Sequence, residues 1–484
     1  MDSILSSIGI ANKAHFYFLF PILFSFCYTV DIQTERKERK SMKLTFGERL
    51  SYALGDFSNN GAYMFVGTFL ITFLTIGMGL SGKVAGAIIM AVTIFDAIND
   101  VIIGSIVDKA HGRGVKYTSF LRFSVLPMAV LMVLLFFSPN FSLGGKIAYS
   151  VIIYAVYTVA QTSFQVPYGS LSGAMTDSSE ERITLGAFRD WGSNLGGFFI
   201  NTFSSVLILH FGGGEMNTQG FFRSALIVGI LLVIGGCIPA FFCKERVPVV
   251  STQQGNLLEG LKSFVKNRNA VVATLVVCLV NCGIMARASF TSFYAPYCLG
   301  DPNLIAPILS VMSVVPLVAI LFVPILTKKL DRKVMYCMAG ISMILAGAIE
   351  SLGGSLATSI VSSILCGFTL CCSITVTWGA IPDIADYGEY ITGTFNPGTI
   401  YSTLTFVMKL ATAFSSLGLG LILDGYGFNA GQVTQAAVNG IRLWYGLIPV
   451  ILGVIVLGIA LFFNLTHKKL EEVHQVLAQR HSAQ

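Results

Sequence analysis

Twelve apolar segments, each about as long as a bilayer is thick, dominate this chain of 484 residues. A spanning helix needs about 20 apolar residues, and each segment meets or approaches that length. Backbone amides in lipid must be satisfied internally, and these segments lack the alternating polarity of barrel strands, so we predict helices. The segments run over 48–76, 83–107, 119–138, 147–174, 186–210, 221–243, 270–298, 304–326, 335–353, 357–382, 398–423 and 441–464. The predicted fold is an all-α membrane protein with twelve transmembrane helices.

Composition excludes other classes of protein. Only 12% of the residues are charged and 54% are hydrophobic, whereas soluble proteins carry about 25% charged residues. This excludes a soluble enzyme, a disulfide-rich secreted protein and a disordered protein. The cysteines lie mostly in apolar runs, the six histidines form no cluster, and neither a zinc framework nor an HExxH motif is present. We therefore expect no enzymatic activity, no cofactor and no metal beyond a coupling cation.

Lys and Arg gather in alternate loops. The less basic set of loops holds Lys83, Lys146, Arg223 and Arg442 only. By the positive-inside rule, the basic loops and both ends of the twelve-helix unit are predicted to be cytoplasmic, in a cell membrane.

The most charged connection falls between the sixth and seventh segments and divides the chain into halves. The predicted units are an N-terminal six-helix half, a central cytoplasmic loop, a C-terminal six-helix half and a cytoplasmic tail, at 42–243, 244–268, 269–464 and 465–484. A weak repeat supports the division, because the loop from Gly104 to Arg113 has a counterpart from Leu326 to Lys333. The first of these loops resembles the G-x-x-x-D-[KR]-x-G-[KR] loop of the major facilitator superfamily, whose parallel halves hold the substrate between them.

Residues 1–41 lie outside this pattern. Their apolar run, 16–30, has about 15 residues, below the 17 to 25 of a spanning helix. Only Lys13 precedes it, whereas a signal peptide begins with a basic region. Because Met42 opens a sequence typical of a natural start, we expect this leader to be a translation-start artefact or an accessory interfacial segment.

Charged side chains inside the apolar segments are informative, because each costs at least about 2.5 to 3.5 kcal/mol in mid-membrane. In the second segment, Asp96, Asn99 and Asp100 lie at i, i+3 and i+4, on one helical face. Carboxylate and amide oxygens suit a hard cation such as sodium, and two close carboxylates also share a proton readily. The pattern indicates a coupling-cation site; the alternative is a structural pair with a basic residue.

Two other segments carry polar stripes. Thr158, Thr162 and Gln165 lie on one face of the fourth segment, either lining a site or joining helices. In the first segment, Asp56 and Asn60 share a face by the i+4 rule.

Three basic residues interrupt later segments. Arg189 opens the fifth segment, Arg287 lies in the seventh, and Lys409 lies in the middle of the eleventh. An isolated lysine in a span predicts function. Pairing with Asp96 or Asp100 across the bundle is the structural alternative for Lys409.

Five blocks together resemble the glycoside-pentoside-hexuronide:cation symporter family, which includes the melibiose permeases. The blocks are ERLSYALGD from Glu48, DAIND from Asp96, VPYGSL from Val166, Glu181-Arg182 followed by Arg189, and PDIADYGE from Pro382. They occur in the family's order across about residues 42–465. The resemblance implies a major facilitator fold of two six-helix halves and secondary active symport of a sugar with a cation.

Carried over by position, the resemblance also implies site residues. The implied cation site comprises Asp96, Asn99, Asp100 and Thr162. The implied sugar site comprises Asn60, Gln165 and Arg189, with Lys409 linking the two sites. In melibiose carriers the first two sugar positions are carboxylates, a lysine replaces Asn59, and a tryptophan replaces Gly169, so a melibiose-like substrate is not expected.

The remaining charges suggest a substrate class. Neutral Asn60 and Gln165, beside Arg189, Arg287 and Lys409, are expected to give a positive cavity that slightly favours a hexuronide over a neutral glycoside or pentoside. The residues do not decide between sodium and a proton as the coupling ion. A lysophospholipid or other amphiphile carrier on the same fold is the alternative function. The expected partners are a small sugar and the bilayer, with no nucleic acid and no obligate protein partner.

Three acidic residues, Asp383, Asp386 and Glu389, crowd one cytoplasmic loop that contains no Lys or Arg. We predict that at least one pairs with a basic residue of the other half, such as Arg113, when the transporter faces outward, and that the pair opens when it faces inward. Exposed pairs are worth only about 0.2 to 1 kcal/mol, which suits a gate. Helix capping or simple solvation is the alternative.

Overall fold

A computed structural model describes residues 44–112, 114–176, 178–247, 257–319, 322–393 and 397–482. Within these residues, twelve helices are long and apolar enough to cross a membrane. The predicted all-α, twelve-helix fold is therefore confirmed, and the protein is a multi-pass membrane protein. The leader, 1–41, and Arg113 lie outside the described residues.

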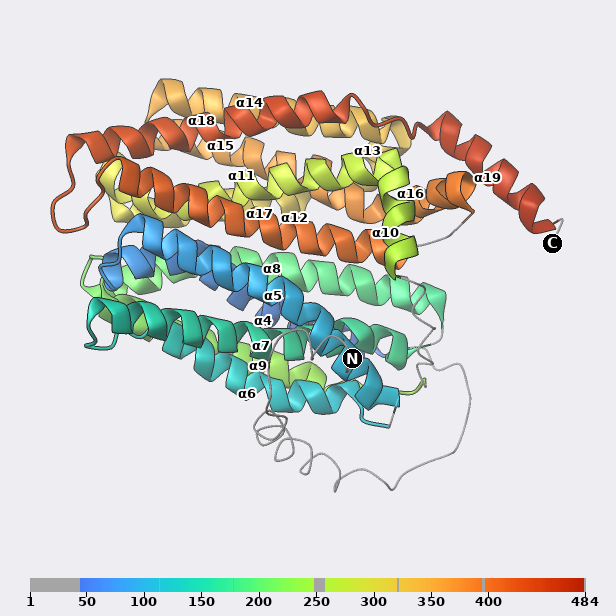
Figure 1. Cartoon of the computed structure of the whole chain (residues 1–484), viewed down its shortest axis with the longest axis horizontal. Coiled ribbons are helices and arrows are strands. Elements are labelled where there is room, and N and C mark those ends of the chain that lie inside the picture. Colours follow the sequence, from blue (N-terminus) through green and yellow to red (C-terminus); the bar gives the residue numbers. More distant parts are fainter. Residues whose placement is uncertain are drawn as a thin grey trace.

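Six long helices of the N-terminal half form the lower part of Figure 1. They are α4 (Phe46–Thr72), α5 (Gly82–Gly112), α6 (Tyr117–Leu135), α7 (Leu143–Met175), α8 (Ser179–Gly212) and α9 (Thr218–Phe242). α4 continues through a π-helical turn, η2 (Phe73–Gly77). Within this half, α4 packs against α8 and α9, α5 against α7, and α6 against α7 and α9.

The spans of the C-terminal half form the upper part of Figure 1. They comprise α11 (Arg268–Cys298), α12 (Ile305–Ala319) with α13 (Val323–Lys329), α14 (Arg332–Gly353), α15 (Leu356–Leu370) with η4 (Cys371–Thr375) and α16 (Val376–Thr392), α17 (Pro397–Gly425) and α18 (Gln435–Ala460). A short 3-10 helix, η3 (Pro302–Leu304), precedes α12. α14 packs against α15 and α18, and α11 against α17 and α18.

Two spans differ from their predicted extents. The predicted segment 304–326 is not one helix: α12 ends at Ala319, and α13 begins at Val323. Pro324 lacks the amide proton that a continuing helix requires, so it belongs in a first helical turn. The tenth span extends to Thr392 and so carries the predicted gate acids on a helix.

Local sequence fixes the start of α4 and the end of α8. The Thr45 hydroxyl accepts a hydrogen bond from the Glu48 amide at 3.3 Å, and the Glu48 carboxylate accepts one from the Thr45 amide at 3.1 Å. This reciprocal capping box satisfies amides that the helix leaves free. α8 ends at Gly212, and the next residue, Gly213, has a φ of 72°, the left-handed conformation that glycine adopts after a helix.

Two further helices, α10 (Leu257–Lys266) and α19 (His467–Ser482), lie at the same end of the bundle (Figure 1). We call this end the basic end. The connections on this side include Lys116, Lys244, Arg246, Lys262, Lys266, Arg268, Lys329, Arg332, Lys333, Lys468 and Lys469. The other end is called the opposite end.

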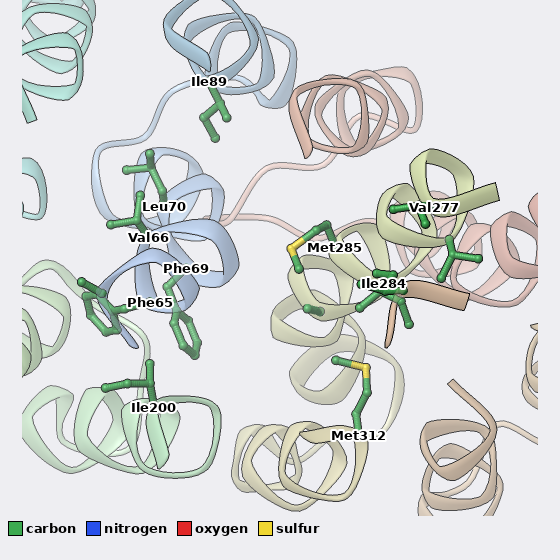
Figure 2. Close-up of a cluster of buried hydrophobic side chains, with 14 of the residues drawn as sticks. Phe65, Val66, Phe69, Leu70, Ile89, Ile200, Val277, Ile284, Met285 and Met312 are labelled. Atoms are coloured by element: carbon green, nitrogen blue, oxygen red, sulfur yellow. The ribbon is translucent and has the colours of Figure 1, made fainter. Parts of the chain in front are cut away.

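The two halves meet where α5 packs against α17, α8 against α12 and α4 against α11. Figure 2 views the hydrophobic part of this interface, with Phe65 and Phe69 of α4 on one side and Met285 of α11 on the other. Toward the opposite end, α5 and α17 touch through glycines. A Cβ atom on Gly420 would lie 2.2 Å from the Gly82 carbonyl oxygen, and one on Gly82 would lie 2.6 Å from the Gly420 carbonyl oxygen. Larger residues would separate the halves here.

Candidate functional site

An ionic cluster joins the two halves near the middle of the bundle. Lys409 of α17 places its Nζ atom 2.6 Å from Asp96 Oδ2 and 2.5 Å from Asp100 Oδ2 on α5. The Thr162 hydroxyl of α7 lies 2.7 Å from Asp100 Oδ1 and 3.3 Å from Asp96 Oδ1. The two aspartates share a face of α5 because they are four residues apart. The structure thus brings together four of the predicted site residues, and we call them the cation cluster.

The cation cluster is short of positive charge. Two carboxylates and one ammonium give −2 + 1 = −1. The side chains of Asp96, Lys409 and Asp100 are 12%, 15% and 34% exposed, so water compensates this charge poorly. Asn99 is also buried, and its Nδ2 atom lacks a hydrogen-bond partner among the described residues. A monovalent cation would complete the charge balance, with carboxylate, hydroxyl and amide oxygens as ligands.

A small cavity adjoins Asp96 on the side of the opposite end. Its polar lining includes Tyr63, Thr93, Tyr157 and Thr412, and its volume is about 30 Å³. A water molecule needs at least about 10 to 15 Å³ of such space, so the cavity accommodates a water or an ion but not a sugar.

Hydrogen bonds between the halves lie at the level of the cation cluster or closer to the opposite end. The Tyr63 hydroxyl is 3.3 Å from the Thr412 hydroxyl, and Ser289 donates to the Gly67 carbonyl at 3.2 Å. Two further bonds, both of 2.9 Å, join Asn201 to Ser313 and Ser310 to Thr202. These bonds join the halves on the side of the opposite end.

Two predicted sugar-site residues lie on the neighbouring helices α4 and α8. Asn60 Nδ2 donates to the Ser193 carbonyl at 2.8 Å, and Arg189 Nε donates to Asp56 Oδ2 at 3.3 Å. Asp56 precedes Asn60 by one turn, and Arg189 precedes Ser193 by one turn, so the contacts form successive rungs between two helices. Gln165 lies exposed on α7. The pairing of Asp56 with Arg189 was not foreseen from the sequence; the only signal was that Asp56 and Asn60 share a helical face.

Arg287 lies in a different place, inside the C-terminal half. Its side chain is 1% exposed and pairs with Glu350 of α14 at 3.3 Å. Its guanidinium carbon lies 4.4 Å from the centre of the Tyr445 ring, and Nη2 donates to the Ser359 carbonyl at 3.4 Å. A side chain so enclosed offers no surface to a sugar. The substrate-binding role predicted for Arg287 is therefore not supported, and its contacts are those of a residue that joins helices.

The predicted gate acids lie on α16 at the basic end. Asp383 pairs with Arg332, and Asp386 lies 3.1 Å from His474 of α19. Arg332 belongs to the same half as the acids and His474 to the C-terminal tail, whereas the prediction concerns a partner from the other half in a different state. Ligand atoms of Asp383, Asp386 and His474 lie within 4.8 Å of one another, a spacing that a metal ion would accept. Arg332 also pairs with Asp383, so these side chains form a network of polar contacts. Glu389 lies one turn further along α16.

Comparisons with known proteins agree with this architecture. Residues 51–467 match the family model described as MFS/sugar transport protein. An uncharacterized symporter of Bacillus subtilis (strain 168) is 31% identical over 90% of this chain and 96% of its own length. An isoprimeverose transporter of Lactiplantibacillus pentosus is 28% identical, covering 90% of this chain and 92% of its own length. A glucuronide carrier protein homolog of Escherichia coli (strain K12) is also 28% identical, covering 90% of this chain and 95% of its own length.

A solved structure shares the fold. A nucleoside transporter superposes with a TM-score of 0.64 at 13% identity, covering 85% of this chain and 99% of its own. At that identity, the likeness concerns the fold alone. Together with the family model and the relatives, the twelve helices and the five sequence blocks place this chain in the glycoside-pentoside-hexuronide:cation symporter family of the major facilitator superfamily.

Proposed function

We propose that this protein is a secondary active transporter that couples sugar uptake to a cation, either sodium or a proton. One observation carries the proposal: Lys409 of one half contacts both carboxylates of the other half, in a cluster with a net charge of −1. A cation that binds Asp96 and Asp100 competes with Lys409. Ion binding in the N-terminal half therefore changes a contact with the C-terminal half.

This competition supplies a coupling mechanism. In the unloaded state Lys409 occupies the position of the coupling cation. When the cation binds, the displaced ammonium needs another acceptor, and sugar hydroxyls are suitable acceptors. A carrier with only one of its two ligands leaves a charge unpaired inside an apolar bundle, which is costly. Empty and fully loaded carriers are therefore the forms expected to cross between states.

The state of the structure follows from its orientation. By the positive-inside rule, the basic end is cytoplasmic, in the cell membrane. The hydrogen bonds between the halves and the Gly82–Gly420 contact then lie on the extracellular side. We infer that the halves are closed on the extracellular side, as in an inward-facing form. Rocking of the two halves about the cation cluster would produce the outward-facing form.

The charges now favour a neutral sugar, which reverses the expectation of a hexuronide. That expectation needed a positive cavity, but Arg189 pairs with Asp56, and Arg287 is enclosed with Glu350. The buried and half-buried charges of Asp56, Asp96, Asp100, Arg189 and Lys409 sum to −3 + 2 = −1, and one bound cation brings this sum to zero; the neighbouring Asp190 is exposed to solvent and is not counted. A neutral glycoside or pentoside preserves that balance. The names of the relatives do not decide, since one is a transporter of isoprimeverose and another a homolog of a glucuronide carrier.

Gradient-driven uptake tests this function. The purified protein is reconstituted into vesicles, and an inward sodium or proton gradient is imposed. Uptake is then followed for a labelled neutral glycoside, a pentoside and a glucuronide. We expect at least one sugar to accumulate above its external concentration with one of the two gradients, and to leave when an ionophore collapses that gradient. Uptake that no gradient increases would contradict the proposal, and transport of a lysophospholipid in place of every sugar would favour the amphiphile carrier.

A further inference from the structure

We propose that Asp56 determines the substrate specificity of the sugar site, by positioning the Arg189 guanidinium and cancelling its charge so that neutral sugars bind better than anionic ones. This inference rests on the proposed transport function. It adds to that function a residue and the reason for a substrate class.

The helices that carry this pair are fixed relative to each other. A Cβ atom on Gly192 would lie 2.1 Å from the Ala53 carbonyl oxygen, and one on Gly196 would lie 2.2 Å from the Phe57 carbonyl oxygen. The backbones of α4 and α8 therefore touch on both sides of Asp56. Small residues allow such close helix contacts in membranes. Because the helices are held by these contacts, the Asp56 carboxylate occupies a defined position beside α8.

Of the two paired side chains, Asp56 is the less accessible to solvent. The Asp56 side chain is 8% exposed, whereas the Arg189 side chain is 29% exposed. The guanidinium carbon also lies 5.8 Å from the centre of the Tyr168 ring, which stacks on Tyr52 with ring centres 4.8 Å apart. Asp56 and Tyr168 thus hold one part of the guanidinium. A guanidinium has five N–H donors, and the contact with Asp56 uses the one on Nε, so donors remain for the hydroxyls of a sugar.

The ion pair with Asp56 decides which ligands suit the remaining N–H donors of Arg189. An unpaired arginine is a strong binder of carboxylates, because two parallel hydrogen bonds add to the charge attraction. With Asp56 in place, the charge of Arg189 is already matched, and the carboxylate of a uronide meets a second carboxylate nearby. Asp190, exposed on α8 beside Arg189, adds a further negative charge. A neutral sugar ring accepts the same hydrogen bonds without that repulsion.

A purely structural role is the competing explanation for this ion pair. A staple between α4 and α8 would support folding and would affect all substrates equally. The glycine contacts already hold α4 and α8 together, so an ion pair is less needed for that purpose here. The two explanations differ in one measurable quantity, the ratio of affinities for a uronide and for the matching neutral glycoside.

The test uses the full chain in vesicles and the gradient that drives uptake. Apparent affinities are measured for a neutral glycoside and for the glucuronide with the same aglycone. In Asp56→Asn, we expect the ratio of uronide to glycoside affinity to rise about tenfold, which corresponds to about 1.4 kcal/mol. Asp56→Glu should keep the wild-type ratio even where uptake is slower. Asp424→Asn is the matched control, since it removes an exposed carboxylate on α17 with the same change of charge, and it should leave the ratio unchanged.

An equal loss of affinity for both sugars in Asp56→Asn, with the ratio unchanged, would overturn the inference and leave the structural staple. If this variant does not reach the membrane, Asp56→Ser removes the same charge and carries the same prediction. Failure of the proposed function looks different, because the wild type would then accumulate no sugar under either gradient. A wild type that accumulates sugar, with a ratio indifferent to the charge at position 56, would reject only the role of Asp56.

Discussion

Two of the ionic groups within the apolar bundle differ in charge balance and in location. The pair of Arg287 and Glu350 has no net charge, and both residues belong to the C-terminal half. Each of the two side chains is 1% exposed. The cluster of Lys409 with Asp96 and Asp100 has a net charge of −1 and joins the two halves. Both are costly to place in a membrane. A buried charge is therefore not by itself a sign of a transport site, and the proposed site differs from the pair of Arg287 and Glu350 in its unbalanced charge and in its position between the halves.

Removing one partner of the balanced pair should have the largest effect on stability. In Glu350→Gln, the Arg287 guanidinium loses its counterion in an enclosed site, and the loss of stability should be about 3 to 5 kcal/mol. Thermal unfolding in detergent measures it, and the protein that remains folded should still couple uptake to the ion gradient. The double variant Arg287→Met with Glu350→Leu should recover much of the loss. Wild-type stability of Glu350→Gln combined with lost coupling would mean that this pair belongs to the transport site.

Removing a carboxylate of the cation cluster should affect coupling instead. In Asp96→Asn or Asp100→Asn, gradient-driven accumulation should disappear while sugar exchange persists, because the proposed sugar contacts lie mainly on other helices. A membrane potential of 100 mV supplies about 2.3 kcal/mol per charge, so about 50-fold accumulation would be lost at that potential. Asp424→Asn, an exposed carboxylate on the same helix as Lys409, is the control. Full accumulation in either cluster variant would reject the cation site.

The glycine contact between α5 and α17 should control which end closes. Gly420→Val places a side chain where a Cβ atom alone would lie 2.2 Å from the Gly82 carbonyl oxygen, whereas a Cβ atom on Gly418 meets nothing within 4 Å. Such overpacking costs about 1 to 3 kcal/mol, which shifts the equilibrium between states roughly 5- to 150-fold. Labelling of a cysteine placed at Thr93 by an impermeant external reagent should increase in Gly420→Val but not in Gly418→Val. Equal labelling of both variants would show that closure does not depend on this contact.

Neutralising the predicted gate acids on α16 should give the smallest effect, a small shift of the equilibrium between outward-facing and inward-facing forms. If Asp386 pairs with the other half in the outward-facing form, Asp386→Asn should favour the inward-facing form by about 0.2 to 1 kcal/mol. The expected result is increased labelling of cavity cysteines from the cytoplasmic side. Asp331→Asn removes a similar contact with α19, to His467 at 2.9 Å, and serves as the control. Unchanged labelling after Asp383, Asp386 and Glu389 are all neutralised would eliminate the gate.

The fold and the cation cluster could be predicted because their signals are local. Runs of apolar residues reveal the spans, and charges inside such runs stand out. The i, i+3, i+4 spacing of Asp96, Asn99 and Asp100 is enough to place them on one face of a helix. The sequence left two roles open for Lys409, a transport function and a structural ion pair with Asp96 or Asp100. The pairing could be foreseen because a lysine in mid-membrane needs a counterion.

What could not be predicted depends on which way a side chain points in the folded bundle. Arg287 and Arg189 look alike in sequence, yet the side chain of Arg287 is 1% exposed and that of Arg189 is 29% exposed. Their partners, Glu350 and Asp56, lie 63 and 133 positions away, beyond the reach of helical spacing. The positive cavity expected from the sequence counted these arginines without their counterions. The charge argument for a hexuronide therefore does not hold, and the substrate class stays a prediction.

The proposed coupling depends on Lys409 occupying the position of the coupling cation in the unloaded protein. Equilibrium binding of the coupling ion to wild type and to Lys409→Met tests it most directly, with labelled sodium or, for a proton, with a titration of proton release. If Lys409 competes with the ion, Lys409→Met should bind the ion about tenfold more tightly than the wild type, equivalent to about 1.4 kcal/mol, while losing sugar coupling. Weaker ion binding in Lys409→Met would mean that Lys409 helps to build the ion site and would contradict the account.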